Sequence, residues 1–367
     1  MAAVAAHAED AGSAAYYTAH PTWDPPSPLA FAALGQRDVS PTLLRVRALA
    51  LEGQIYESET GNPELALPGR FDFAFVAVYL APLVLIALLH DLWSGEREAG
   101  RAALLGAAPR ARWRLWAPRI GVRAGLVLLA LLLPFFAGAV ISGADPGRTL
   151  LFAGAVAGLM SFWTAVSVAV ARYGARSAVN AAALAGVWFA LTLIVPAGGN
   201  LLINAAVPIP AGADLARANR DAVHGAWDQP QQQTLDRFLA LHPEWVGTAP
   251  LSTPFHWKWY FAFQHLGDVQ VAEQSAEYRQ GIERREALAG ALGWMASPVG
   301  FQRALHRLAE TDVTAQLAYQ DRVRAFHDRL RAFYYPYLFR DLPFERDDFE
   351  RAPRFGVTDE SSPLDRA

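Results

Sequence analysis

Four long apolar segments lie between residues 71 and 210, and they constrain the fold of this chain more than any other feature. A helix needs about 20 apolar residues to cross roughly 30 Å of hydrocarbon. Each segment has an uncharged core long enough for this, so we expect membrane spans at about 73–90, 120–143, 149–171 and 180–204. Four buried helices of a soluble protein are the alternative, but helices that cover a core carry a polar stripe and these do not. The sequence therefore favours an all-α, polytopic membrane protein.

Arginines in the short loops predict the orientation of the spans. The loop at 91–119 and the start of the second span hold seven arginines, and the loop between the third and fourth spans holds two. The turn between the second and third spans holds only Arg148. Because cytoplasmic loops are enriched in Arg and Lys, we expect the first and third loops inside the cell. Residues 1–70 and 205–367 would then both lie outside, flanking a membrane domain at 71–204.

Translocation of residues 1–70 needs a signal that this sequence does not show. The first residues have neither the basic region nor the apolar region of a signal peptide. We therefore expect one span upstream of residue 1 and, by the same reasoning, another after residue 367. On this interpretation the chain is part of a longer membrane protein whose first and last spans are missing here.

Composition excludes several classes of site. The chain has no cysteine, which excludes disulfides, thiolate zinc sites, iron–sulfur ligation by cysteine and a cysteine nucleophile. Its formal net charge is −3, so no general basic field is available for nucleic acid. The phosphate-binding loop and the HExxH zinc motif are also absent from the sequence. We therefore predict no catalytic residue and no bound cofactor in this chain.

Histidines are concentrated in residues 205–367, which hold six of the nine in the chain. Histidine is the commonest metal-binding side chain, so a metal site is one interpretation. Their spacings match no ligand signature, and we favour histidines that are satisfied internally or exposed, with no metal. These six residues are His224, His242, His256, His265, His306 and His327.

The two outside segments differ in character. Residues 205–367 alternate helical patterns with proline breaks, which predicts a mostly helical extracytoplasmic domain with its own core. In residues 1–70, Ser40 and Pro41 resemble a helix start, with serine as N-cap and proline at the first helical position. Apolar residues from Leu43 to Ile55 follow at roughly helical spacing. We expect an amphipathic helix there, docked on the outer domain or lying along the membrane surface.

The loop at 91–119 is the most informative polar feature. It places Glu96, Arg97 and Glu98 directly after the first span, then a short apolar stretch and a basic turn. This pattern is typical of a short amphipathic helix held at the inner membrane surface. Two roles stay open: an arginine anchor that binds anionic headgroups, or a docking element for a cytoplasmic protein.

At this loop the sequence resembles a known family. The pattern D-x-x-S-G-E-R-E-x-G, followed by a Leu-Leu pair and a basic turn, is similar to that of type-2 ABC transporter permease subunits. FAALGQRDVSP, GRFDFAF, HWKWY and LAETD resemble a poorly characterised branch with a long extracytoplasmic loop, so the resemblance covers roughly residues 20–355. This branch is loosely similar to the permease that helps mature nitrous-oxide reductase.

The resemblance implies a six-span subunit in the cytoplasmic (inner) membrane of a bacterium, paired with a second copy or a sister permease. A separate cytoplasmic ABC ATPase, which carries the ATP, would dock on the loop at 94–113. The docking residues that it implies are Ser94, Glu96, Arg97, Glu98, Arg101, Leu104, Leu105, Arg110, Arg112 and Trp113.

Polar and aromatic groups inside the spans supply the candidate substrate pathway. Polar residues in membrane helices usually face protein or water, which singles out Trp163, Asn180, Asn200 and Asn204. Their alternative role is in hydrogen bonds and contacts between helices.

Three functions follow from these observations. The first is a permease subunit without its own nucleotide site, which moves an unidentified substrate when an ATPase docks. The second is a membrane-anchored scaffold whose outer domain binds an envelope partner, without transport. The third, an intramembrane or envelope enzyme, is disfavoured because the spans lack a paired-carboxylate, histidine-rich or Ser–Lys arrangement. In none of them do we expect a nucleic-acid partner.

Overall fold

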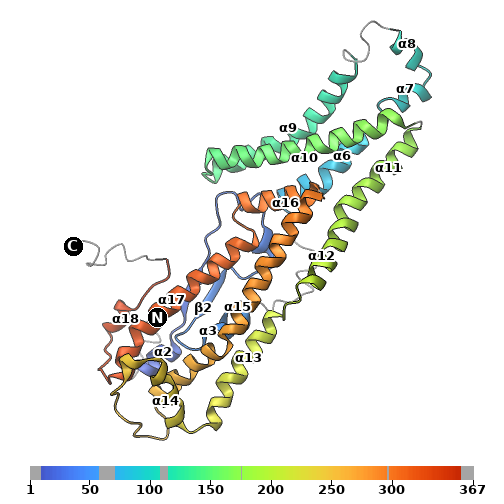
Figure 1. The fold of residues 1–367 in the computed structure, drawn as a ribbon. Helices are drawn as coiled ribbons and strands as arrows, with labels where there is room; N and C mark the ends of the chain where they lie inside the picture. Colours follow the sequence, from blue (N-terminus) through green and yellow to red (C-terminus); the bar gives the residue numbers. More distant parts are fainter. Residues whose placement is uncertain (1–9, 58–70, 108–114, 175, 296, 357–367) are drawn as a thin grey trace.

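The computed structural model describes residues 10–57, 71–107, 115–174, 176–295 and 297–356. Helices dominate these residues, and the expected all-α class is confirmed. The chain forms a part made of apolar helices and an elongated helical part that extends away from it (Figure 1). The helix α11–α12 runs along one side and leads from the first part into the second.

Four helices in the described ranges are long and apolar enough to cross a membrane, which supports a multi-pass membrane protein. They coincide with the four predicted spans and cover Phe73–Glu98, Ala117–Ile141, Pro146–Tyr173 and Ser177–Ala206. The first contains α5 (Phe73–Phe75), a π turn η2 (Val76–Leu80), α6 (Ala81–Leu89) and α7 (Ser94–Glu98), and is followed by α8 (Ala102–Gly106). The second is α9 and the third is α10; the fourth contains α11 (Ser177–Phe189), a π turn η4 (Ala190–Ile194) and α12 (Val195–Ala206).

One continuous apolar cluster holds these helices together. Phe135 of α9 stacks on Phe152 of α10 with ring centroids 4.7 Å apart, and on Phe73 at 5.3 Å. Leu305, from a helix far along the chain, lies fully buried in the same cluster. Leu129, Leu133 and other large apolar side chains of α9 point outward instead, as expected for surfaces that face lipid.

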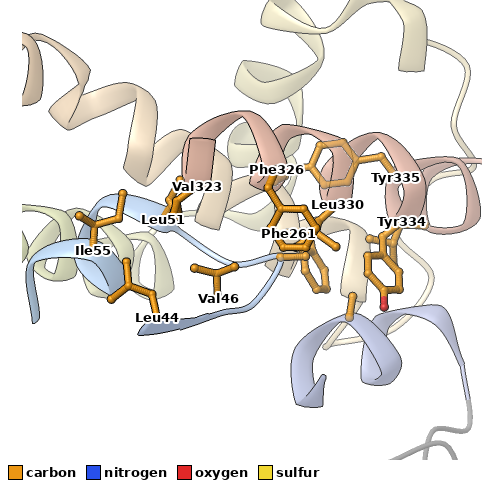
Figure 2. Packing of buried hydrophobic residues seen from close by; sticks show 14 of the residues in the cluster. Leu44, Val46, Leu51, Ile55, Phe261, Val323, Phe326, Leu330, Tyr334 and Tyr335 are labelled. Carbon is orange, nitrogen blue, oxygen red and sulfur yellow. The ribbon is translucent and has the colours of Figure 1, made fainter. Parts of the chain in front are cut away.

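From the second half of the chain, the elongated part takes six helices and two 3-10 turns of the described residues. These are α13 (Gly212–Gly225), η5 (Ala226–Asp228), α14 (Gln231–Leu241), η6 (Pro243–Trp245), α15 (Trp257–Met295), α16 (Ser297–Leu308), α17 (Val313–Phe339) and α18 (Asp348–Arg351). The helix α15 is 39 residues long and lies beside α17 (Figure 1). Phe261 of α15 meets Phe326, Leu330 and Tyr334 of α17 in the core of this part (Figure 2).

The N-terminal segment completes that same core. It contains α2 (Ala11–Tyr17), β1 (His20–Trp23), the 3-10 turn η1 (Gly35–Asp38), β2 (Leu43–Val46) and α3 (Leu51–Glu57). Leu44, Val46, Leu51 and Ile55 lie against α17 and its neighbours (Figure 2). Residues 10–57 and 212–356 therefore fold together, although the four spans separate them in the sequence.

The helix predicted from Ser40 onward is wrong in its first half. Leu43–Val46 is a strand that pairs antiparallel with His20–Trp23, with Val46 opposite His20 and Leu43 opposite Trp23. Leu44 and Val46 are buried whereas Leu43 and Arg45 are exposed, the alternation of a strand with one covered face. Only Leu51–Glu57 is helical, and it packs against α13, which is the docked position rather than one along the membrane surface.

Buried histidines in the elongated part predict a loss of stability on acidification. Burial lowers the pKa of His20 to about 4, and burial together with Arg331 lowers the pKa of His265 to about 3. In the unfolded chain both would titrate near 6.5, so as pH falls below that value the unfolded state binds protons that the folded state cannot. Each histidine should therefore remove on the order of 2 kcal/mol from the free energy of unfolding between pH 7 and pH 5.

Denaturant unfolding of the detergent-solubilised chain at the two pH values measures this loss. His20→Phe should remove roughly one histidine's share of it, whereas His224→Gln, at an exposed position, should leave it unchanged. The same pH dependence in His20→Phe and in the unchanged chain would contradict the assignment.

Candidate functional site

Two short helices, rather than one amphipathic helix, form this region: α7 ends the first span and α8 follows it. In Figure 1, α7 and α8 lie at the end of the apolar helices farthest from the elongated part. Glu96 accepts hydrogen bonds from Arg101 Nε at 2.8 Å and from Arg119 Nη1 at 2.9 Å. Since Arg119 belongs to the first turns of α9, this carboxylate ties α7 to the second span.

Glu98 ties α7 to the fourth span. Its Oε1 accepts a hydrogen bond from the Ser177 backbone N–H at 2.7 Å, and its Oε2 lies 2.9 Å from the Ser177 hydroxyl. Ser177 is the first residue of α11, where a carboxylate is stabilised by the unpaired N–H groups of the helix start. Arg97 also donates to the Gly174 carbonyl in the loop after α10. The two loops predicted to be cytoplasmic are thus joined to each other through α7.

Asn180 also connects α7 and the end of α6 to the fourth span. It is only 1% exposed, and its Nδ2 donates to the His90 carbonyl at 3.0 Å and to the Ser94 hydroxyl at 3.2 Å. The backbone at Gly174 approaches it so closely that a Cβ there would lie 1.5 Å from Asn180 Oδ1. Asn180 is therefore a helix-contact residue, the alternative role considered for it.

The other candidate pathway residues do not converge with Asn180. Trp163 is fully buried in the apolar cluster, and its Nε1, like the Ser167 hydroxyl, has no hydrogen-bond partner among the described residues. Asn200 and Asn204 are exposed on α12, toward the other end of the fourth span. These four residues do not form one polar path in this chain.

The outward-facing part of the predicted docking loop is mostly apolar and basic. Leu104 is 77% exposed on α8, Leu105 is half-buried, and Arg101 keeps most of its side chain in the open. Arg110, Arg112 and Trp113 lie outside the described residues. Of the predicted docking residues that the structure describes, Ser94, Glu96, Arg97 and Glu98 bond within the chain, and Ser94 is fully buried. Arg101 bonds Glu96 through Nε but keeps a side chain that is 62% exposed, and Leu104 is exposed.

Sequence reasoning missed several members of this site. Arg119 and Ser177, the partners of Glu96 and Glu98, gave no motif of their own. Trp93 and Trp116 pack with ring centroids 5.0 Å apart at the two ends of the loop, and Arg119 lies over the Trp116 ring at 5.3 Å. Tryptophan at both ends of a charged loop is a signal that could have been read, since tryptophan is enriched at membrane interfaces.

Histidines of the elongated part form one close pair. His242 Nε2 and His265 Nε2 are 3.0 Å apart, and the Nδ1 atoms face Glu244 and the Tyr335 hydroxyl. Across the part of the chain that the structure describes, no three His, Asp or Glu side chains gather as metal ligands. The paired rings satisfy each other, so this pair has a structural explanation.

Comparison with family models finds a match for part of the chain. Residues 213–358 match the family model described as a domain of unknown function (DUF3526). The matched region corresponds to the elongated part from α13 to α18 and contains none of the four apolar spans. No curated protein and no solved structure matches the chain.

Proposed function

We propose that this chain is the membrane-spanning subunit of an ATP-binding cassette transporter. It would move a substrate across the cytoplasmic membrane when a separate ATPase subunit docks on the loop at 94–113. A second copy or a sister permease would complete the pathway, and the ATP would be held by the partner rather than by this chain.

The joining of the two loops through α7 is the observation that carries the proposal. A transporter driven by a separate ATPase needs an element that passes movement from the docked protein to the membrane helices. The helix α7 belongs to the first span, and Glu96 and Glu98 bond it to the second and fourth spans. Displacing α7 would therefore displace three spans together, because packed elements move as units rather than deforming continuously.

Leu104, the exposed apolar residue that follows α7 in the chain, is the proposed point of contact with the ATPase. Leu104 is 77% exposed, and an apolar residue ringed by polar ones is a common feature of protein interfaces. Arginines beside it, such as Arg101, would add charge complementarity to an acidic rim on the ATPase. The role expected for Glu96 and Glu98 changes accordingly, from touching the ATPase to holding α7 in place.

Co-purification in mild detergent tests the proposal. The tagged protein, expressed in its native host, should retain a nucleotide-binding subunit in stoichiometric amount. Leu104→Asp should reduce the retained subunit at least about tenfold, the effect of roughly 1.4 kcal/mol. Val246→Asp, at a 68% exposed apolar position of the elongated part, is the matched control and should change nothing.

Two results would overturn the proposal. Retention of the ATPase by Leu104→Asp at the level of the control would move the docking site elsewhere. A partner bound to the elongated part, with no ATPase, would favour the membrane-anchored scaffold and leave the loop as a topology anchor.

A further inference from the structure

The turn between α15 and α16 is an apolar hairpin at the far end of a long charged helix. Residues 287–302 contain no charged side chain and lie between Glu286 and Arg303. The two helices meet backbone to backbone, because a Cβ on Gly293 would lie 2.9 Å from Gly300 Cα. This tip differs from the rest of α15, whose middle carries many charged residues.

The hairpin tip packs along the spans rather than beyond their ends. Phe301 touches α10 at Gly158, where a Cβ would lie 3.0 Å from the Phe301 ring, and the Tyr79 hydroxyl donates to Gln302 Oε1 at 3.0 Å. Gly158 is twelve residues from the start of α10, and at 1.5 Å per residue it lies about 18 Å along that helix. Leu292 likewise packs against Gly199 of α12.

The base of the hairpin lies level with the ends of the spans. Arg285 Nε donates to the Val207 carbonyl at 2.9 Å, directly after α12 ends. Glu310 pairs with Arg148 in the first turn of α10. If α10 and α12 cross the bilayer, residues between these two contacts lie within its outer half.

A groove of about 700 Å³ runs between α15 and α16, and its polarity changes along its length. Glu286, Arg303 and Arg307 line the end near the base, whereas Gly290, Gly300 and Phe301 line the part toward the tip. The lining residues that the structure describes all belong to α15 or α16, and none of them comes from a span.

The polar end of the groove carries more positive than negative charge. Arg303 pairs with Glu286 and also donates to its carbonyl at 2.9 Å, but its buried Nε has no partner in the described chain. Arg307 is largely exposed, and its contact with Asp312 is long, at 3.6 Å. The lining thus carries two arginines against one carboxylate.

We propose that this groove binds one glycerophospholipid of the outer leaflet. Its phosphate would lie at Arg303 and Arg307, and one acyl chain would follow the glycines to Phe301. The lining residues are arranged as a lipid in that leaflet would require. The arginines lie at the level of the headgroups, and the glycines and Phe301 lie deeper in the bilayer. Basic pockets between membrane helices bind lipid headgroups in this way. The inference does not depend on transport or on a docked ATPase.

Native mass spectrometry of the full chain, delipidated and titrated with phosphatidylglycerol, tests the site. Arg307→Ala should weaken the tightest bound lipid about fivefold, the effect of one basic residue near a headgroup. Ala304→Trp, which fills the groove, should abolish that lipid. Arg217→Ala, an exposed arginine in a similarly long ion pair on α13, is the control and should leave it unchanged. Equal lipid binding by all three variants would overturn the proposal, as would competition by inorganic phosphate at the same concentration as the lipid.

A second experiment tests whether the hairpin tip lies in the membrane. Because the chain has no cysteine of its own, a single introduced cysteine can be labelled specifically. Ala291→Cys lies at an exposed position near the tip, and in proteoliposomes it should resist a water-soluble maleimide. The exposed Val246→Cys should be labelled fully under the same conditions. Both should react in detergent after unfolding. Rapid labelling of Ala291→Cys in the bilayer would place the hairpin in water and exclude the lipid groove.

Discussion

Replacing Asp268 with alanine is expected to lower the free energy of unfolding by about 3–5 kcal/mol. Asp268 pairs with Arg331 at 2.6 Å, and it accepts hydrogen bonds from the backbone N–H groups of Leu51 at 2.8 Å and Glu52 at 3.1 Å. It also accepts from Asn219 Nδ2 at 3.1 Å. Without the carboxylate, the buried guanidinium of Arg331 has lost its counter-ion and the start of α3 has lost its cap.

Denaturant unfolding of the solubilised chain measures the effect of Asp268→Ala. Asp321→Ala is the matched control, because Asp321 pairs with Arg279 in the same part of the molecule and both side chains are partly exposed. Exposed ion pairs contribute about 0–1 kcal/mol, so the control should change stability little. Equal losses in the two variants would show that burial does not decide the strength of these pairs.

Replacing Phe135 with alanine should be about as costly in the apolar part, at about 3–5 kcal/mol. The ring is fully buried and stacks on Phe152 and Phe73, and more distantly on Phe31 at 6.2 Å. It therefore joins two spans, the start of a third and the N-terminal segment. The resulting cavity should lower the midpoint of thermal unfolding in detergent.

Leu133→Ala on the same helix provides the comparison for Phe135→Ala. Leu133 is 61% exposed on the outward side of α9, where lipid or detergent replaces the contacts of the lost atoms. Because lipid tails are as apolar as leucine, its removal should cost little. A large loss in Leu133→Ala would indicate that this face of α9 packs against protein instead.

The spans could be predicted closely because their signal is local. The predicted span at 149–171 falls within Pro146–Tyr173, and the one at 180–204 falls within Ser177–Ala206. The observed helices extend a few residues beyond the apolar cores, since charged and polar residues are tolerated at the ends of a span. Arg119 and Arg123 lie within α9 for that reason.

The strand at Leu43–Val46 was mistaken because a short apolar run fits helix and strand spacing almost equally well. Its partner His20–Trp23 lies about two dozen residues earlier, and only the pairing decides which face is buried. The docking loop shows the same limitation. Glu96 and Glu98 looked available to a partner, but Arg119 and Ser177, far along the chain, engage them.

The sequence by itself determined that four apolar helices exist, where their apolar cores lie, and that cysteine chemistry and the usual nucleotide loop are absent. These properties depend on composition and on the spacing of residues within one segment, and both can be read directly from the amino-acid sequence. The tertiary structure alone decided that residues 10–57 complete the core of residues 212–356, that α7 joins the loops between the spans, and that the tip of α15 and α16 packs along the membrane helices. Each of these depends on contacts between residues that are 23 or more positions apart in the sequence, and local periodicity carries no information about such partners.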